Sequence, residues 1–193
     1  MPTKPDALGN ARRLLRKYLW RAFFTSRYDR AAASAAINDF RALRSVFLGE
    51  KDESEVPIFN EKDYPIAEAE ELIAAGWPKN KNTLGRGILA LSILAGARDI
   101  ADDAQVTRQH LNQREYHHLF PNALLQEAEL EKDEIFRSLN CALITWRTNR
   151  TISNKDPMVY LRERAESNDL GEDDLRRKLA THLIDLDSLN VGN

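Results

Sequence analysis

Two adjacent histidines, His117 and His118, are the residues of this chain best suited to chemistry. They follow Tyr116 and precede Leu-Phe-Pro, and two carboxamides, Asn140 and Asn149, come later in the chain. An imidazole with a pKa of about 6.5 is unprotonated at neutral pH and can take a proton from water. Imidazole nitrogens and carboxamide oxygens can also hold a divalent cation, which stabilises charge on a phosphate. These residue types together indicate metal-assisted cleavage of a phosphodiester.

The candidate residues lie in three short segments of the sequence. Two of these segments have the pattern of a strand and one has the pattern of a helix, and these elements must position the side chains. Residues 114–120 and 136–145 each favour a strand, and residues 146–153 favour a short helix. Neighbouring strand residues point to opposite faces, so His117 and His118 cannot share one role in a regular strand. If the strand ends there, one imidazole can face a metal while the other faces water.

Helical patterns dominate the N-terminal part of the chain. Apolar residues recur at three- and four-residue spacing over 8–27, and again over the residues that follow Asp29 up to about Leu48. Asp29 is the expected N-cap of the second helix. The turn between the two helices is short, which predicts an antiparallel hairpin. The acidic, proline-containing stretch 49–65 is expected to be a connection.

Two further helices are expected before the histidine segment. A short helix over 66–75 should end at Gly76 as a C-terminal cap. Thr83 should then cap an apolar helix from Leu84 to about Ala97, whose near-uniform apolarity predicts a place in the core.

The sequence therefore predicts a mostly α fold with a small embedded core of two strands and a helix. We expect a helical scaffold over residues 1–97, the core over 98–157, and C-terminal helices over 158–193 that pack on the same domain. The first of these C-terminal helices should start at Pro157, and the last should span residues 172–186.

Composition excludes several classes of protein. The chain has 193 residues, of which 42% are hydrophobic, and this is enough for a packed core. Its longest apolar run, 88–97, is too short to span a bilayer, and the N-terminus lacks a secretory signal. Cys141 is the only cysteine, so no internal disulfide can form. We expect a cytoplasmic protein without a membrane partner, in which Cys141 is a small buried hydrophobe.

The net charge of −2 hides a strong asymmetry along the chain. Residues 1–30 carry eight basic side chains against two acidic ones, and residues 136–164 carry six against two. Residues 50–71 carry nine acidic side chains against two basic ones. The basic blocks could face a phosphate backbone, although solvated helix faces are the plainer explanation of the same charges.

The spacing of the candidate residues resembles a known family. His117-His118-Leu-Phe-Pro121, then Asn140-Cys-Ala-Leu-Ile-Thr, then Thr148-Asn149-Arg150-Thr-Ile-Ser-Asn-Lys155 is similar to the HNH, or ββα-metal, nucleases. More narrowly, the first and last of these runs resemble the C-terminal nuclease domain of GmrSD-type modification-dependent (type IV) restriction proteins of phage defence. Residues 15–28 resemble the helical region that precedes the motif there. The resemblance covers most of the chain, and its specific part is 116–155.

The resemblance implies a DNA endonuclease that nicks or cleaves phosphodiesters with one divalent metal. His118 matches the general base that activates water. His117 and Asn149 match the metal ligands. Asn140 matches the residue that holds the loop of the motif and orients the base. Phosphate contacts are expected from three basic residues: Arg147, Arg150 and Lys155.

Two departures from the family pattern bear on the metal. His stands at 117 where Asp is commoner, which removes a negative charge and should favour Mn²⁺ or Ni²⁺ over Mg²⁺. Asn149 replaces the final His of the family name, and this is a variant that the family also uses.

The resemblance also implies partners. These are DNA and a ParB-like nucleotidase or sensor domain, in the same chain or in a partner chain. Gly85-Arg-Gly87 lacks the further glycine and the preceding strand of a phosphate-binding loop, so nucleotide-driven sensing would need that other domain. The chain is therefore expected to be part of a larger protein.

Other functions remain open at the level of sequence. The paired basic blocks also suit a non-catalytic DNA-binding or interaction module that keeps an HNH scaffold. An RNA-directed nuclease is less favoured, because no aromatic strand pattern for stacking RNA bases is present. The remaining polar and aromatic candidates are expected to serve as turn, cap or packing residues: His110, His182, Asp99, Asp102, Asp103, Trp20, Trp77 and Trp146.

Overall fold

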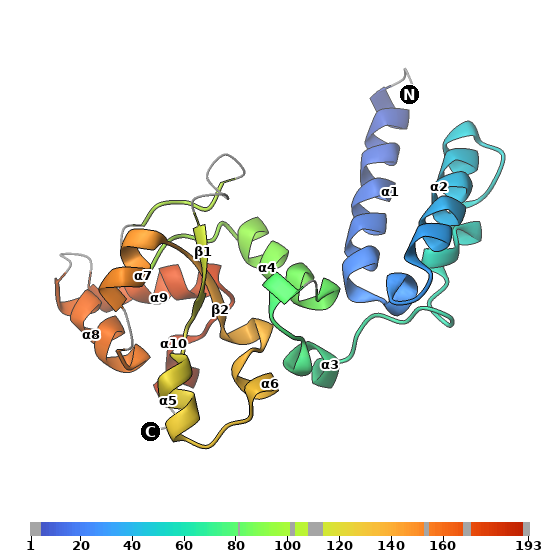
Figure 1. The fold of residues 1–193 in the computed structure, drawn as a ribbon. Helices are drawn as coiled ribbons and strands as arrows, with labels where there is room; N and C mark the ends of the chain where they lie inside the picture. Colours follow the sequence, from blue (N-terminus) through green and yellow to red (C-terminus); the bar gives the residue numbers. More distant parts are fainter. Residues whose placement is uncertain are drawn as a thin grey trace. The chain divides into compact units, whose positions relative to one another are not determined.

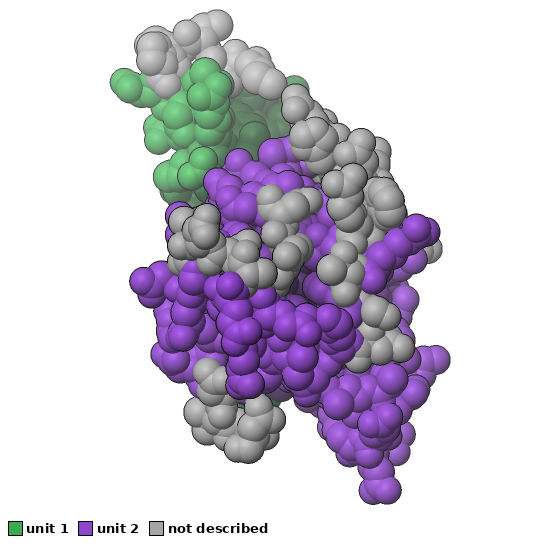
Figure 2. Space-filling view, turned by 90° about the vertical axis from the view of Figure 1, so that its left-hand side faces the viewer, with its two compact units in different colours: residues 1–72 green, residues 73–193 purple. Residues whose placement is uncertain are grey.

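The chain is mostly helical in a computed structural model (Figure 1). The structure describes residues 5–80, 82–100, 103–107, 114–152, 155–167 and 171–190. It divides into two compact units, residues 1–72 and 73–193, which Figure 2 shows in green and purple. This division falls earlier than the expected limit at residue 97. Among the described residues, no helix has the length and apolarity needed to cross a membrane.

The first unit is built on two helices, both of which were predicted from the spacing of their apolar residues. They are α1 (Pro5–Phe24) and α2 (Ala32–Leu48), joined through the 3₁₀ turn η1 (Ser26–Tyr28). Two further 3₁₀ turns follow, η2 (Glu53–Glu55) and η3 (Pro57–Phe59). Apolar side chains from α1, α2 and the η3 segment form one core: Leu14, Leu43, Val56, Ile58 and Phe59.

The start of α2 differs from the expectation. Asp29 does not cap the helix, because it ends the preceding turn η1, where its N–H donates to the carbonyl of Ser26. Helix α2 begins three residues later, after Ala31, which has a left-handed backbone (φ 50°) and makes no side-chain cap. At the other end Gly49 also takes a left-handed conformation (φ 76°), which glycine adopts without steric cost.

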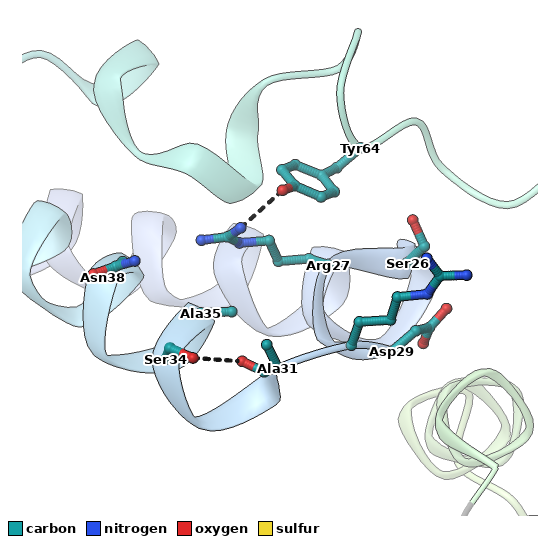
Figure 3. A pocket seen from close by; sticks show the side chains of 9 residues that line it. Ser26, Arg27, Asp29, Ala31, Ser34, Ala35, Asn38 and Tyr64 are labelled. Carbon is teal, nitrogen blue, oxygen red and sulfur yellow. Dashed lines mark hydrogen bonds between the residues drawn. The ribbon is translucent and has the colours of Figure 1, made fainter.

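A buried carboxylate ties the first unit together. Asp39 has no exposed surface and accepts two hydrogen bonds from Arg27, at 2.9 and 3.1 Å, and one from the Tyr28 hydroxyl at 2.6 Å. Arg27 also donates to the Tyr64 hydroxyl at 2.8 Å (Figure 3). The hydrogen bond to Asp39 raises the pKa of Arg27, and burial raises the pKa of Tyr28. Asp39 thus holds η1, α2 and the later connection in one arrangement.

Replacing Asp39 should destabilise the first unit strongly. We expect Asp39→Ala to lower the free energy of unfolding by about 3–5 kcal/mol, because the Arg27 charge would stay buried without its counter-ion. Urea unfolding followed by circular dichroism measures this change. Glu70→Ala, at an exposed site, should shift the free energy by less than about 0.5 kcal/mol. Equal effects of the two substitutions would contradict the role given to Asp39.

The second unit contains the sheet, and helices surround it. Strand β1 (Arg114–His118) pairs antiparallel with β2 (Cys141–Thr145), so that His118 lies opposite Cys141 and Arg114 lies opposite Thr145. The other elements are α3 (Ala69–Ala74), which spans the limit between the units, η4 (Pro78–Asn80), α4 (Thr83–Leu94), α5 (Asn122–Glu127), α6 (Lys132–Ile135), η6 (Ser138–Asn140), α7 (Trp146–Ile152), α8 (Pro157–Ser167), α9 (Gly171–Thr181) and α10 (Leu186–Asn190).

The order β1, β2, α7 brings the candidate residues onto three neighbouring elements. Helices α5 and α6 lie in the connection between the strands, and α7 follows β2 directly and contacts both strands. The main core of this unit joins the sheet to the C-terminal helices through these residues: Ile100, Leu119, Ala142, Ile144, Ile152, Tyr160, Leu161, Leu175, Leu179 and Leu186.

Two helix caps expected in the second unit, at Thr83 and at Gly76, differ from those in the structure. Asn82, rather than Thr83, caps α4, because its side-chain oxygen accepts from the Gly85 N–H at 2.6 Å. Gly76 does not cap α3 but forms an isolated bridge to Arg137. A Cβ at Gly85 would lie 2.3 Å from the Gly76 carbonyl oxygen. Glycine is therefore needed at position 85 for close packing of backbone.

The strands and the last helix are shorter than predicted. The 3₁₀ turn η6 occupies the three residues before Cys141, so the second strand starts at Cys141 and not at residue 136. The helix expected over 172–186 stops at Thr181, and α10 begins at Leu186. Leu183 in the gap has a left-handed backbone (φ 62°), which ends the helical path.

Candidate metal centre

The two adjacent histidines lie on opposite faces of β1. His117 is buried and faces α7, where it meets Asn149. His118 is half-buried and stacks on Trp77. The strand thus remains regular to its last residue, and the period of two separates the imidazoles. The structure brings His117 and Asn149 together and does not bring His118 to them.

His117 and Asn149 form the closest pair of candidate ligands. The Nδ1 atom of His117 lies 2.8 Å from the Oδ1 atom of Asn149. A carboxamide oxygen only accepts, so without a metal Nδ1 carries the proton, and a cation bound at Nδ1 would require the other neutral tautomer, with the proton on Nε2. This Nε2 is buried and has no hydrogen-bond partner among the described residues. Burial lowers the pKa of His117, although the bond to Asn149 acts in the opposite direction. The imidazole is therefore neutral at pH 7, as a metal ligand must be.

Glu115 completes this cluster, and sequence reasoning did not select it. It stands two residues before His117, which places it on the same face of β1. Its carboxylate accepts a hydrogen bond from Nδ2 of Asn149. The spacing Glu-x-His on a predicted strand was the signal that could have indicated it.

These donors fit one divalent cation. Two ligands bound at right angles, each about 2.1 Å from a small hard cation, lie about 3 Å apart. The 2.8 Å separation of His117 Nδ1 and Asn149 Oδ1 is close to that value. Among the described residues, no group of three His, Cys, Asp or Glu side chains forms a metal site. The candidate centre therefore depends on the carboxamide of Asn149 beside His117 and Glu115.

Asp99 fixes the start of α7 and therefore the position of Asn149. It has no exposed surface and accepts from the Thr145 backbone N–H and, at 2.6 Å, from the Thr148 hydroxyl. Arg114 pairs with the same carboxylate at 3.3 Å. The Thr145 hydroxyl accepts from the Thr148 N–H at 3.2 Å, as a helix N-cap does. Asp99 takes the turn position expected of it, since its carbonyl accepts from the Asp103 N–H at 3.1 Å, and its carboxylate also holds the corner between β2 and α7.

Asn140 holds the loop that follows β1. Its Oδ1 accepts from the Phe120 N–H at 2.7 Å, and its Nδ2 donates to the carbonyls of Phe120 and Ile135 at 3.1 and 3.2 Å. Its backbone carbonyl accepts from the Leu119 N–H at 2.9 Å. Within the described part of the chain, no hydrogen bond joins Asn140 to His118.

An aromatic clamp, formed by Trp77 and Phe136, holds His118. The Trp77 ring stacks on the imidazole with 4.1 Å between ring centroids, and the Phe136 ring meets it edge-on at 4.8 Å. The Nε2 atom of His118 is buried and has no hydrogen-bond partner in the described ranges. Burial, and then the neighbouring His117, lower the pKa of His118. Trp77 is a buried packing residue, as the sequence predicted.

The structure describes the side chains of two of the three candidate phosphate-binding residues, Arg150 and Lys155. Lys155 pairs with Glu163 at 2.6 Å. Arg150 is exposed in the last turn of α7. The side chain of Arg147 and the whole of His110 lie outside the described residues.

A hollow in the first unit offers less to chemistry than the His117 cluster. It has a volume of about 650 Å³ and is drawn in Figure 3. Arg27 forms part of its wall, but its charge is balanced by Asp39. His182, the remaining histidine, is buried against the carbonyl of Arg98 in the second unit and serves packing.

Comparison of the chain with protein-family models, with curated proteins and with solved structures finds no match in any of the three.

Removing the Asn140 carboxamide should destabilise the loop after β1. We expect Asn140→Ala to lower the free energy of unfolding by about 2–3 kcal/mol, because the Phe120 and Ile135 backbone groups lose their partners. Chemical denaturation measures the change. Asn80→Ala, at an exposed carboxamide, is the matched control and should change little. A variant of Asn140 as stable as this control would show that the loop does not need it.

Cys141 should be unreactive in the folded protein. Burial raises the pKa of its thiol to about 12, so almost no thiolate exists at pH 8. We expect labelling by Ellman's reagent to be slow in buffer and fast in guanidinium chloride. Rapid labelling of the native chain would contradict the half-buried position of Cys141 opposite His118.

Proposed function

We propose that this chain is a metal-dependent DNA endonuclease of the HNH, or ββα-metal, type, which serves a bacterial restriction or phage-defence system. The approach of His117 Nδ1 to Asn149 Oδ1, at 2.8 Å across a sequence separation of 32 residues, carries this proposal. The order of two antiparallel strands and a following helix supports it, because that order matches the architecture of the family.

His117, Asn149 and Glu115 would hold one divalent cation. When bound, the cation would act as a Lewis acid on the phosphate and on the leaving oxygen. The carboxylate of Glu115 supplies the negative charge that a histidine at 117 does not. One imidazole nitrogen with two kinds of oxygen donor suits Mn²⁺ or Ni²⁺ as well as Mg²⁺.

In this proposal His118 accepts the proton of the attacking water. Its lowered pKa keeps the imidazole unprotonated at neutral pH, as a base requires. Its Nε2 is buried in the aromatic clamp, so this atom reaches water only after the ring leaves Trp77. Asn140 acts on the site by holding the loop. Arg147, Arg150 and Lys155 would contact phosphates, and a ParB-like sensor domain would govern access to DNA.

Plasmid nicking tests the proposed function and separates the two histidines. With Mg²⁺, Mn²⁺ or Ni²⁺ the purified chain should nick supercoiled DNA. His118→Ala should lower the rate by about a hundredfold or more, the usual cost of losing a general base, and should still bind Mn²⁺. His117→Ala should lose both nicking and Mn²⁺ binding. Tyr116→Phe, on the exposed part of the same strand, is the control and should nick normally.

Equal nicking by His118→Ala and the unchanged chain would contradict the base assignment. Parallel digestion of single-stranded RNA and duplex DNA would identify the polymer that is cut.

A second candidate function is a non-catalytic DNA-binding or interaction module that keeps the same scaffold. The observation that favours it is the buried Nε2 of His118, on the strand face opposite His117. Salt-sensitive DNA binding without nicking under any of the three metals would support this candidate.

A further inference from the structure

Helix α2 presents a second apolar stripe, on the side that does not face its core. Ile37, Phe40 and Phe47 follow one another at spacings of three and seven residues, which places them along one face of a helix. They are 51%, 66% and 36% exposed. The core side of the same helix carries Ala35 and Leu43, which are buried.

Helix α1 presents a matching pair of leucines. Leu15 and Leu19 are each 48% exposed and stand one helical turn apart. Leu15 is about 100° round the helix from Leu14, which packs in the core. Lys17, which binds Glu53, lies on the other flank of Leu14.

Both stripes fall on one side of the helix pair. Leu14 of α1 and Leu43 of α2 meet in one core with Phe59, so each helix turns the same face inward. The segment 50–64 lies on the flank of α1 that carries Lys17, where Glu53 pairs with it. On α2 the same segment lies toward the flank of Asn38, since Asn38 and Tyr64 line one hollow. The opposite flanks of the two helices carry the exposed apolar residues. We name this the outer face: Leu15, Leu19, Ile37, Phe40, Phe47 and Leu48.

The rim of the outer face is basic. Arg12 and Arg16 on α1, and Arg41 and Arg44 on α2, are exposed. The only acidic residue of α1 is Asp6 in its first turn, and the only one of α2 is Asp39, which is buried and paired with Arg27. Helices α1 and α2 therefore contribute no acidic side chain beside the apolar stripes.

We propose that the outer face binds an amphipathic helix of a partner protein, with a Leu, Ile or Phe stripe at heptad spacing and Asp or Glu beside it. Apolar contact would cover the stripes, and the acidic flanks would meet the four arginines. A second copy of this chain would bring arginines against arginines. A phosphate backbone would meet the arginines but leave the apolar side chains in water. The proposal is independent of the nuclease activity.

A pair of designed peptides tests this inference with the full chain. One is a fluorescein-labelled helix of about 21 residues with Leu at its heptad positions and Glu beside them, and its match carries Lys in place of Glu. Fluorescence anisotropy should show binding of the Glu peptide and much weaker binding of the Lys peptide. Phe40→Ser and Arg44→Glu should each weaken binding of the Glu peptide about tenfold or more.

Leu94→Ser is the matched control, since Leu94 is 69% exposed in the second unit and lies outside the outer face. It should leave peptide binding unchanged. Lack of binding of the Glu peptide, or equal binding of the Lys peptide, would overturn the proposal. A dimer that Phe40→Ser dissociates would assign the outer face to a second copy. Binding to anionic vesicles that Phe40→Ser abolishes, without peptide binding, would assign it to a membrane surface.

Discussion

The buried carboxylate of Asp99 is the interaction on which the candidate centre depends. It receives the Thr145 N–H and the Thr148 hydroxyl, and it pairs with Arg114 at the first position of β1. One side chain therefore fixes the end of β2, the first turn of α7 and the start of β1 together. A buried carboxylate is tolerated only when hydrogen bonds and an opposite charge replace its lost hydration. Asp99 therefore requires all three elements in one arrangement. Asn149 follows Thr148 directly and reaches His117 as a consequence.

The pleat of β1 imposes the second constraint. It sends His117 toward α7 and His118 toward Trp77 and Phe136, so the proposed ligand and the proposed base occupy different environments. Burial lowers the pKa of both imidazoles, and both are neutral at pH 7. In the proposed mechanism, metal binding and proton transfer would therefore start from opposite faces of one strand, and the His118 ring would have to leave Trp77 to reach water.

Sequence patterns predicted the elements better than their ends or their long-range contacts. The helical period located α1 and α2, and near-uniform apolarity located α4. The predicted place of α4 in the core was wrong, because its buried residues are Gly85, Gly87 and Ser92 and its leucines and isoleucines are partly or fully exposed. The caps at Asp29 and Thr83 were wrong, since a 3₁₀ turn used Asp29 and the neighbouring Asn82 reached Gly85 first. Roles that arise from contacts between distant segments left no local pattern: Asp99 at the corner of α7 and Trp77 on His118.

The proposed cation bound by His117, Asn149 and Glu115 can be located by anomalous diffraction from crystals soaked in Mn²⁺. We expect one anomalous peak bounded by these three side chains, and its loss in crystals of Asn149→Ala. Crystals that bind Mn²⁺ elsewhere, or that show no anomalous peak beside His117 at saturating Mn²⁺, would contradict it.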